Sequence, residues 1–140
     1  DTSLKGGNAH SGISFWCSQI EQTHIGDGTS RTYMLGEKSI DTRWYLTGGG
    51  DAEGGAENET ALTGYNNDNF RNSGYVPLRD RSGQDITTAF GSAHSSGCNF
   101  VMCDGASRTI SFSIDAAVHQ ALAHRSDGSG IEERGLTQGN

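Results

Sequence analysis

The chain has 140 residues, of which 21 are glycine and 32% are hydrophobic, so it suits one domain with a modest core and long loops. Ten basic against seventeen acidic residues give a formal net charge of −7, and the basic residues are scattered along the chain. Nucleic acids and anionic membranes are bound by clustered basic side chains, so neither class of partner is expected. No apolar run approaches the ~20 residues that a membrane-spanning helix needs.

The first third of the chain holds three short runs that we expect to form strands. Residues 13–20, ISFWCSQI, are rich in bulky apolar side chains, which favours a strand. Residues 31–37 follow an Asp-Gly turn at Asp27-Gly28 and are rich in β-branched and aromatic residues, which predicts a second strand. The Ser and Thr after that turn would equally suit the cap of a short helix. Residues 44–46, WYL, are the third candidate.

Residues 47–81 lack a clear periodicity, and we interpret them as an ordered, decorated loop. The first part of this loop is acidic, and the second part is rich in Asn and Gly with aromatic residues as anchors. Its oxygen-bearing side chains are of the kind that calcium prefers, although the EF-hand pattern is absent. A calcium site and a solvated acidic loop both fit this composition. The candidate calcium ligands are Asp51, Glu53, Asn66 and Asp68.

Residues 98–113 give the strongest local prediction, which is a β-hairpin. Residues 98–103 are largely apolar, Asp104-Gly105 is a turn dipeptide, and residues 108–113 alternate polar with apolar side chains. A tight hairpin turn needs a positive φ, which Gly adopts freely and Asp tolerates. His94 lies just before the hairpin, and we expect it to hold the start of the hairpin by hydrogen bonds to backbone groups.

Residues 114–124 are predicted to form one short helix. Ile114, Val118 and Leu122 recur every four residues and make an apolar stripe that would pack on a sheet. Ser113 suits the N-cap, and Gly128 suits the end of the helix. The chain is therefore expected to be a single α+β domain over residues 1–140, an antiparallel sheet with long Gly/Asn-rich loops and a short C-terminal helix.

The three cysteines leave two interpretations open. Cys98 and Cys103 would point to opposite faces of one strand, which argues against a disulfide between them. Cys17 could pair with either of them, or all three could be small buried thiols. Their spacing does not match a zinc site.

The sequence contains no motif that identifies an enzyme. A G-x-S-x-G elbow, a phosphate-binding loop and a dinucleotide fingerprint are all absent. His94 has serines beside it, but neighbours in the chain rarely form a nucleophile–base pair. Carboxylate pairs suited to glycoside hydrolysis can be drawn in any acidic protein. We therefore expect no enzymatic activity, and a carboxylate-dependent hydrolase is the most distant alternative.

One spacing resembles a known family. His94 is followed after nine residues by Asp104-Gly105, and this is similar to the signature of a large planctomycete family named for its His-x9-Asp-Gly motif. That family is a domain of unknown function joined to a prepilin-type N-terminal segment. Residues 25–38, IGDGTSRTYMLGEK, also resemble the family's Asp-Gly-Thr-Ser-Asn-Thr and Gly-Glu block, with Arg31 in place of the usual Asn.

Two further segments, residues 64–71 and 114–128, are similar to segments of the same family, so the resemblance extends over about residues 10–131. It implies a β-rich head that normally follows a long hydrophobic helix, as in pilins and type II secretion pseudopilins. This chain starts with a polar segment and no Met, so we expect a mature or truncated product, a pilin-like head lacking its N-terminal helix. Secretion pseudopilins can bind calcium in a head loop, but the resemblance assigns no ligand to a particular residue here.

The resemblance implies a non-enzymatic cell-surface or filament subunit that is extracellular, at the cell surface or periplasmic. Its partners would be other copies or pilin-like subunits, contacted through the missing helix, and this fragment itself would make no membrane contact. The alternative is an extracellular module that binds calcium or a glycan through residues 47–81. Under the first interpretation the motif residues are structural: His94, Asp104, Gly105, Asp27, Gly28 and Glu37.

Overall fold

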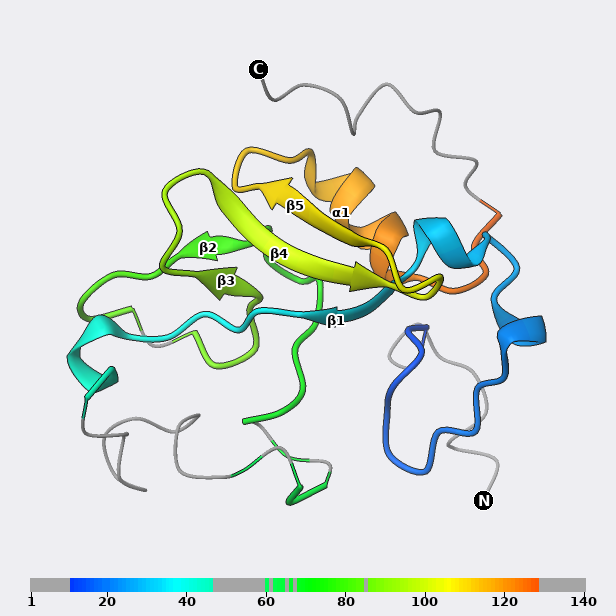
Figure 1. Cartoon of the computed structure of the whole chain (residues 1–140), viewed down its shortest axis with the longest axis horizontal. Helices are drawn as coiled ribbons and strands as arrows, with labels where there is room; N and C mark the ends of the chain where they lie inside the picture. The colour runs from blue at the N-terminus through cyan, green and yellow to red at the C-terminus, as the bar shows by residue number, and fades with distance from the viewer. Residues whose placement is uncertain are drawn as a thin grey trace.

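The computed structural model describes residues 11–46, 60, 62–64, 66, 68–84 and 86–128. Within these residues the regular elements are short, and loops connect them (Figure 1). In chain order they are the 3-10 helices η3 (Gln22–His24) and η4 (Thr29–Arg31), β1 (Tyr33–Gly36), the 3-10 helix η5 (Thr42–Trp44), β2 (Leu78–Arg79), β3 (Gly91–Ser92), β4 (Gly97–Met102), β5 (Ser107–Ser111) and α1 (Ala116–Ala123).

A three-stranded antiparallel sheet in the order β1-β4-β5 forms the centre of the domain (Figure 1). β4 lies in the middle, so β1 and β5 are the two edges. The pairing of β1 with β4 shifts between Tyr33 and Leu35, which leaves a bulge at Met34. This sheet, with the helix that follows it, confirms the predicted α+β class. β2 and β3 form a separate parallel pair of two residues each beside it.

The predicted hairpin is present as β4 and β5. Five residue pairs join the two strands, from Gly97 with Ser111 to Val101 with Ser107. At the turn, Gly105 has a φ of +86°, and the Asp104 carboxylate accepts a hydrogen bond from the Ala106 backbone N–H at 2.9 Å. The turn therefore forms for the reason that the sequence suggested, because Gly adopts the positive φ at no steric cost.

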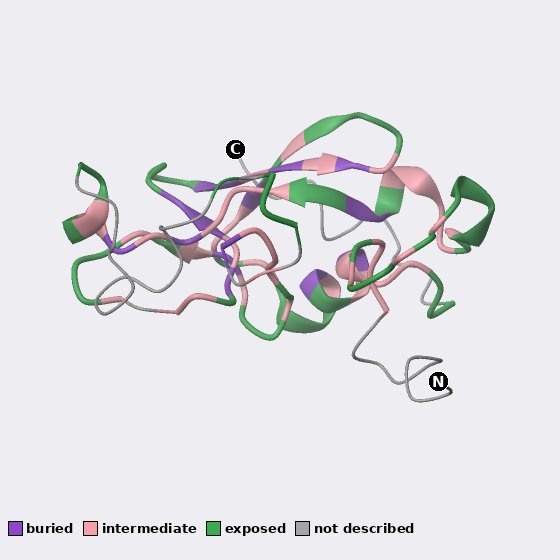
Figure 2. Ribbon diagram, turned by 90° about the horizontal axis from the view of Figure 1, so that it is seen from below, coloured by how far each residue is buried: buried purple, intermediate pink, exposed green. Residues whose placement is uncertain are grey.

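The core lies between the sheet and α1. Along β4, Cys98, Phe100 and Met102 alternate with more exposed residues and point inward, as the period of two requires. They pack with buried residues of β1, β5 and α1, and Figure 2 shows buried positions on the strands and on one side of the helix. The buried hydrophobic cluster is Tyr33, Cys98, Phe100, Met102, Ile110 and Leu122.

The helix is shorter than predicted and differs at both ends. Its N-cap is Asp115, whose carboxylate accepts the backbone N–H groups of Ala117 and Val118 at 2.8 and 3.1 Å, whereas Ser113 bonds to Ser111 instead. The helix ends at Ala123, well before Gly128. Leu122 is fully buried as predicted. His119, which the apolar stripe did not include, is equally buried.

Two of the three strands predicted in the first third of the chain are wrong. Residues 13–20 are irregular because Cys17 has a left-handed φ of 57° and Ser18 donates a turn hydrogen bond to the Phe15 carbonyl. Residues 44–46 begin inside η5, which Asp41 caps by accepting the Arg43 backbone N–H at 2.9 Å. The strand predicted over residues 31–37 is present as β1, and the short helix that the Ser and Thr also suited is present before it as the 3-10 helix η4.

All three cysteines are free thiols, with Cys98 buried, Cys103 partly buried and Cys17 exposed. In the described part of the chain, none of the helices is both long and apolar enough to cross a membrane.

Candidate functional site

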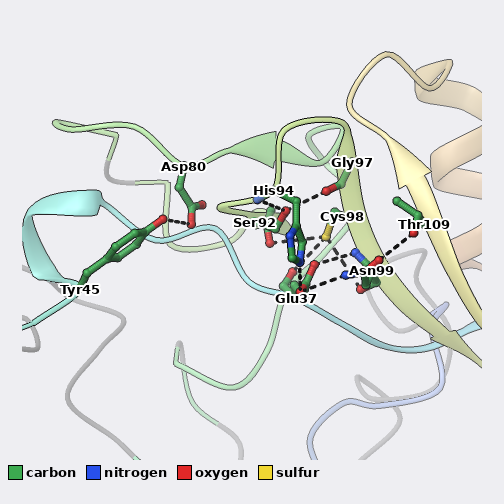
Figure 3. A network of polar contacts seen from close by, with 10 residues as sticks. Glu37, Tyr45, Asp80, Ser92, His94, Gly97, Cys98, Asn99 and Thr109 are labelled. Atoms are coloured by element: carbon green, nitrogen blue, oxygen red, sulfur yellow. Dashed lines mark hydrogen bonds and ion pairs between the residues drawn. The ribbon is translucent and has the colours of Figure 1, made fainter.

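Two of the motif residues meet at the open end of the hairpin. Glu37 directly follows β1, where its backbone N–H donates to the Asn99 carbonyl and its own carbonyl accepts from Gly91. Its carboxylate thereby faces β4 and accepts three hydrogen bonds or ion-pair contacts (Figure 3). The partners are the Asn99 backbone N–H at 2.7 Å, the Asn99 Nδ2 at 3.3 Å and the His94 Nε2 at 3.1 Å.

A serine fixes the segment that carries His94. The Ser92 hydroxyl donates to the Gly97 carbonyl at 2.8 Å and accepts the His94 backbone N–H at 3.2 Å, which closes the connection between β3 and β4 (Figure 3). The imidazole then bonds to a side-chain carboxylate, whereas the sequence predicted backbone partners. Asp104-Gly105 lies at the other end of β4, so the structure joins His94 with Glu37 and not with the turn.

The electrostatics of this cluster stabilise its charged carboxylate. Burial raises the pKa of Glu37, but hydrogen bonds from the backbone and side chain of Asn99 and the contact with His94 outweigh this effect, so the net pKa lies below its usual value. The pKa of the Cys98 thiol shifts upward instead, although hydrogen bonds with the Glu37 and Gly91 carbonyls oppose the shift. Burial, with the Glu37 charge nearby, raises its pKa to about 12, so it is a neutral thiol at physiological pH.

These contacts make the cluster a structural clamp between β1, β3 and β4. Among the described contacts, the hydroxyl group near His94 is that of Ser92, which is buried and donates to the Gly97 carbonyl. The raised pKa of Cys98 keeps its side chain a neutral thiol. The imidazole is occupied by Glu37. The hydrogen bonds of this cluster join the strands, and one of its members that the sequence analysis missed is Asn99. Its position between two inward-facing residues of a strand was the signal that it faces the opposite side.

We expect Glu37→Ala to lower the free energy of unfolding by about 1–2 kcal/mol, because the Asn99 backbone N–H loses its acceptor. The matched variant His94→Ala should cost well under 1 kcal/mol, since it removes an exposed ion pair. Urea denaturation of both variants measures the two effects. Equal losses, or a larger loss for His94→Ala, would contradict the clamp.

Asp27 and Gly28 lie elsewhere, and Asp27 joins its turn to the last described residues. The Asp27 carboxylate accepts the backbone N–H groups of Asp127 and Gly128 at 2.7 and 3.0 Å, and Gly28 has a φ of +98°. Asp27, His124 and Asp127 also present possible metal ligand atoms within 4.8 Å of one another. Both oxygens of Asp27 already accept backbone hydrogen bonds, so this group has a structural role without any ion.

Of the four candidate calcium ligands, Asn66 and Asp68 lie within the described residues. Asp51 and Glu53 lie outside the described residues. The Asn66 side-chain oxygen accepts the Asp68 backbone N–H at 2.7 Å, which forms a local turn. Asp68 itself is only 2% exposed, and both oxygens of its carboxylate lack a hydrogen-bond partner.

A broad cleft of about 1720 Å³ runs beside β1. One wall is formed by residues 11–18, a second by Gly64 and residues 68–74, and α1 contributes a third. Arg125 anchors the first wall, because it donates from its backbone to the Ser11 carbonyl and from its guanidinium to the Gly12 carbonyl. The apolar residues lining the cleft include Ile13, Phe15, Met34, Leu35, Phe90 and Ala121.

The comparison with protein families assigns the chain to one of them. The family described as a protein of unknown function, DUF1559, matches residues 3–117. The chain belongs to this family. The matched range contains Asp27-Gly28, Glu37, His94 and Asp104-Gly105, so both the clamp and the hairpin turn belong to the DUF1559 domain. No curated protein and no solved structure matches the chain.

Proposed function

We propose that this DUF1559 domain is the non-enzymatic head of a cell-surface or filament subunit of pilin-like type, and that the cleft beside β1 seats the apolar helix of such a subunit. The observation that carries the proposal is the exposed apolar edge of the sheet. Met34 and Leu35 on β1 are 41% and 63% exposed and line the cleft. Contiguous exposed apolar surface on a soluble domain marks a site of interaction.

The dimensions and position of the cleft support this occupant. Apolar residues from β1, α1 and residues 11–18 face the same space, so a helix laid there would bury one apolar stripe against these three segments. The bulge at Met34 disrupts the β1 edge, which favours side-chain packing over the addition of another strand. A protein with this role would lie at the cell surface or in the periplasm, and its partners would be other subunits of the same assembly.

The two rival functions have less support. A glycan- or calcium-binding module would be expected to line its cleft with Trp44, Tyr65 or Tyr75. Trp44 and Tyr75 do not line the cleft, and Tyr65 lies outside the described residues. A hydrolase would gather His94 with carboxylates in a pocket, whereas His94 and Glu37 form an exposed pair that is not among the described residues lining the cleft.

The test introduces Leu35→Glu into the whole gene product, expresses it in the organism that encodes it, and measures assembly of the subunit. Burial of a leucine contributes about 1.5–3 kcal/mol, so a charge at this position should reduce the subunit recovered in the sheared surface fraction by roughly tenfold or more. Leu62→Glu is the matched control, since Leu62 is 95% exposed and does not line the cleft. Melting of the purified domains checks that both variants fold. Normal recovery of folded Leu35→Glu would contradict the proposal.

A further inference from the structure

The loop wall of the cleft contains a buried carboxylate that has no hydrogen-bond partner. Asp68 is 2% exposed, and neither oxygen of its side chain has a hydrogen-bond partner. An unpaired buried carboxylate is costly, and native proteins pair or coordinate such groups. Asp68 lies in the lining of the cleft, so the missing partner can come from whatever occupies the cleft.

The loop around Asp68 is built by contacts of its own. The Asn66 side chain accepts the Asp68 backbone N–H, and the Asn69 side chain donates to the carbonyls of Thr60 and Gly64 at 3.0 and 3.1 Å. The Asp68 carboxylate takes no part in these turns. Within the described part of the loop, no hydrogen bond of the Asp68 side chain accounts for its burial.

We propose that the polypeptide segment seated in the cleft presents a lysine or arginine to Asp68. This inference rests on the proposed function and names the charge that its occupant must carry. A long basic side chain suits the position because its apolar stem can pack along the cleft wall while its charged end reaches the buried carboxylate. A calcium ion would need about six to eight oxygen ligands, and the nearby Asn66 oxygen is already occupied by the Asp68 backbone.

The experiment uses two designed helical peptides of about 18 residues, or five turns. Both have an apolar face of Leu and Ala, a face of Ser and Gln, and blocked termini. One carries a single central Lys, and the other has Gln there. Calorimetry with the purified domain should show the Lys peptide binding at least about tenfold more tightly, as a charge-assisted pair in a desolvated site requires.

Asp68→Asn should remove this preference and raise the Tm of the free domain by a few degrees, because a neutral amide replaces a buried carboxyl group that has no hydrogen-bond partner. Asp104→Asn changes the net charge equally but lies in the hairpin turn, so it should keep the preference. A lower Tm for Asp68→Asn, with the preference retained, would overturn the inference.

The remaining outcomes separate this inference from the proposed function. Equal binding of the two peptides would overturn the role of Asp68 and leave the apolar seat intact. Failure of both peptides to bind would overturn both the role of Asp68 and the apolar seat. A rise in Tm with millimolar calcium that Asp68→Asn abolishes would overturn the basic side chain in favour of a metal ion.

Discussion

Lowering the pH from 6.5 to about 4 should cost the domain roughly 3 kcal/mol through His119 alone. This side chain is fully buried among Tyr33, Phe90 and Phe100. Burial lowers its pKa from 6.5 to about 4, and the Tyr75 backbone opposes this shift only in part. The Nε2 atom of His119 is buried and has no hydrogen-bond partner. The Nδ1 atom is 3.2 Å from the Tyr33 hydroxyl. The difference in pKa between the folded and unfolded chain corresponds to the roughly 3 kcal/mol stated.

The sign of this pH effect on stability follows from whether the folded or the unfolded chain binds the proton. Between pH 6.5 and about 4 the unfolded chain protonates His119 while the folded domain does not, so protonation favours unfolding. The contribution is complete above pH 6.5, declines through this window and changes no further below about pH 4. Urea denaturation across the window measures it.

The control for this prediction is His119→Gln, with His119→Phe if the first variant fails to fold. Other groups titrate alike in wild type and variant, so the difference between their pH profiles isolates His119. Between pH 6.5 and about 4, the free energy of unfolding of the variant should fall by roughly 3 kcal/mol less than that of the wild type. Parallel profiles would show that His119 is accessible to protons in the folded domain.

The second large effect is expected for Phe100→Ala, which should lower the free energy of unfolding by about 3–5 kcal/mol. Phe100 is 1% exposed, stacks on Tyr33 with ring centroids 4.1 Å apart and contacts Phe90 at 4.9 Å. The packing around it is tight, since a Cβ at Gly36 would lie 2.6 Å from a Phe100 ring carbon. Neighbours held this closely cannot collapse into the cavity, so the loss is near the upper range.

Val101→Ala is the matched control for Phe100→Ala. Val101 is the next residue on β4, points away from the core and is only partly buried, so its truncation should cost about 1 kcal/mol. Denaturant titration of both variants gives the comparison. A loss for Val101→Ala as large as that for Phe100→Ala would mean that the inward face of β4 has been assigned wrongly.

Local chemistry explains which parts of the fold the sequence predicted. The turn at Asp104-Gly105 and the strand at residues 31–37 depend on neighbours in the chain, and both were found as expected. The strand expected at residues 13–20 failed because Cys17 adopts a left-handed conformation that no local pattern announces. For the helix the composition was sufficient, but its cap was displaced by two residues because a carboxylate at Asp115 reaches two backbone N–H groups.

The candidate sites were less accessible to sequence reasoning, because they join distant segments. Glu37 and His94 are 57 residues apart and meet only through the pairing of β1 with β4, whose register includes a bulge. His119 could have been recognised, since it lies three residues before Leu122 on the same face of a helix. The burial of the Asp68 carboxylate without a hydrogen-bond partner is a tertiary feature, whereas composition indicated only that its oxygens suit calcium.

The most direct test of the seat beside β1 is amide hydrogen exchange, measured on the isolated domain and on the whole subunit in its assembled form. The account predicts that added protection concentrates at Met34, Leu35 and the α1 residues that line the cleft, with little change on β5. Unchanged exchange along β1, together with new protection on β5, would place the contact surface on the other edge of the sheet and contradict the proposed seat.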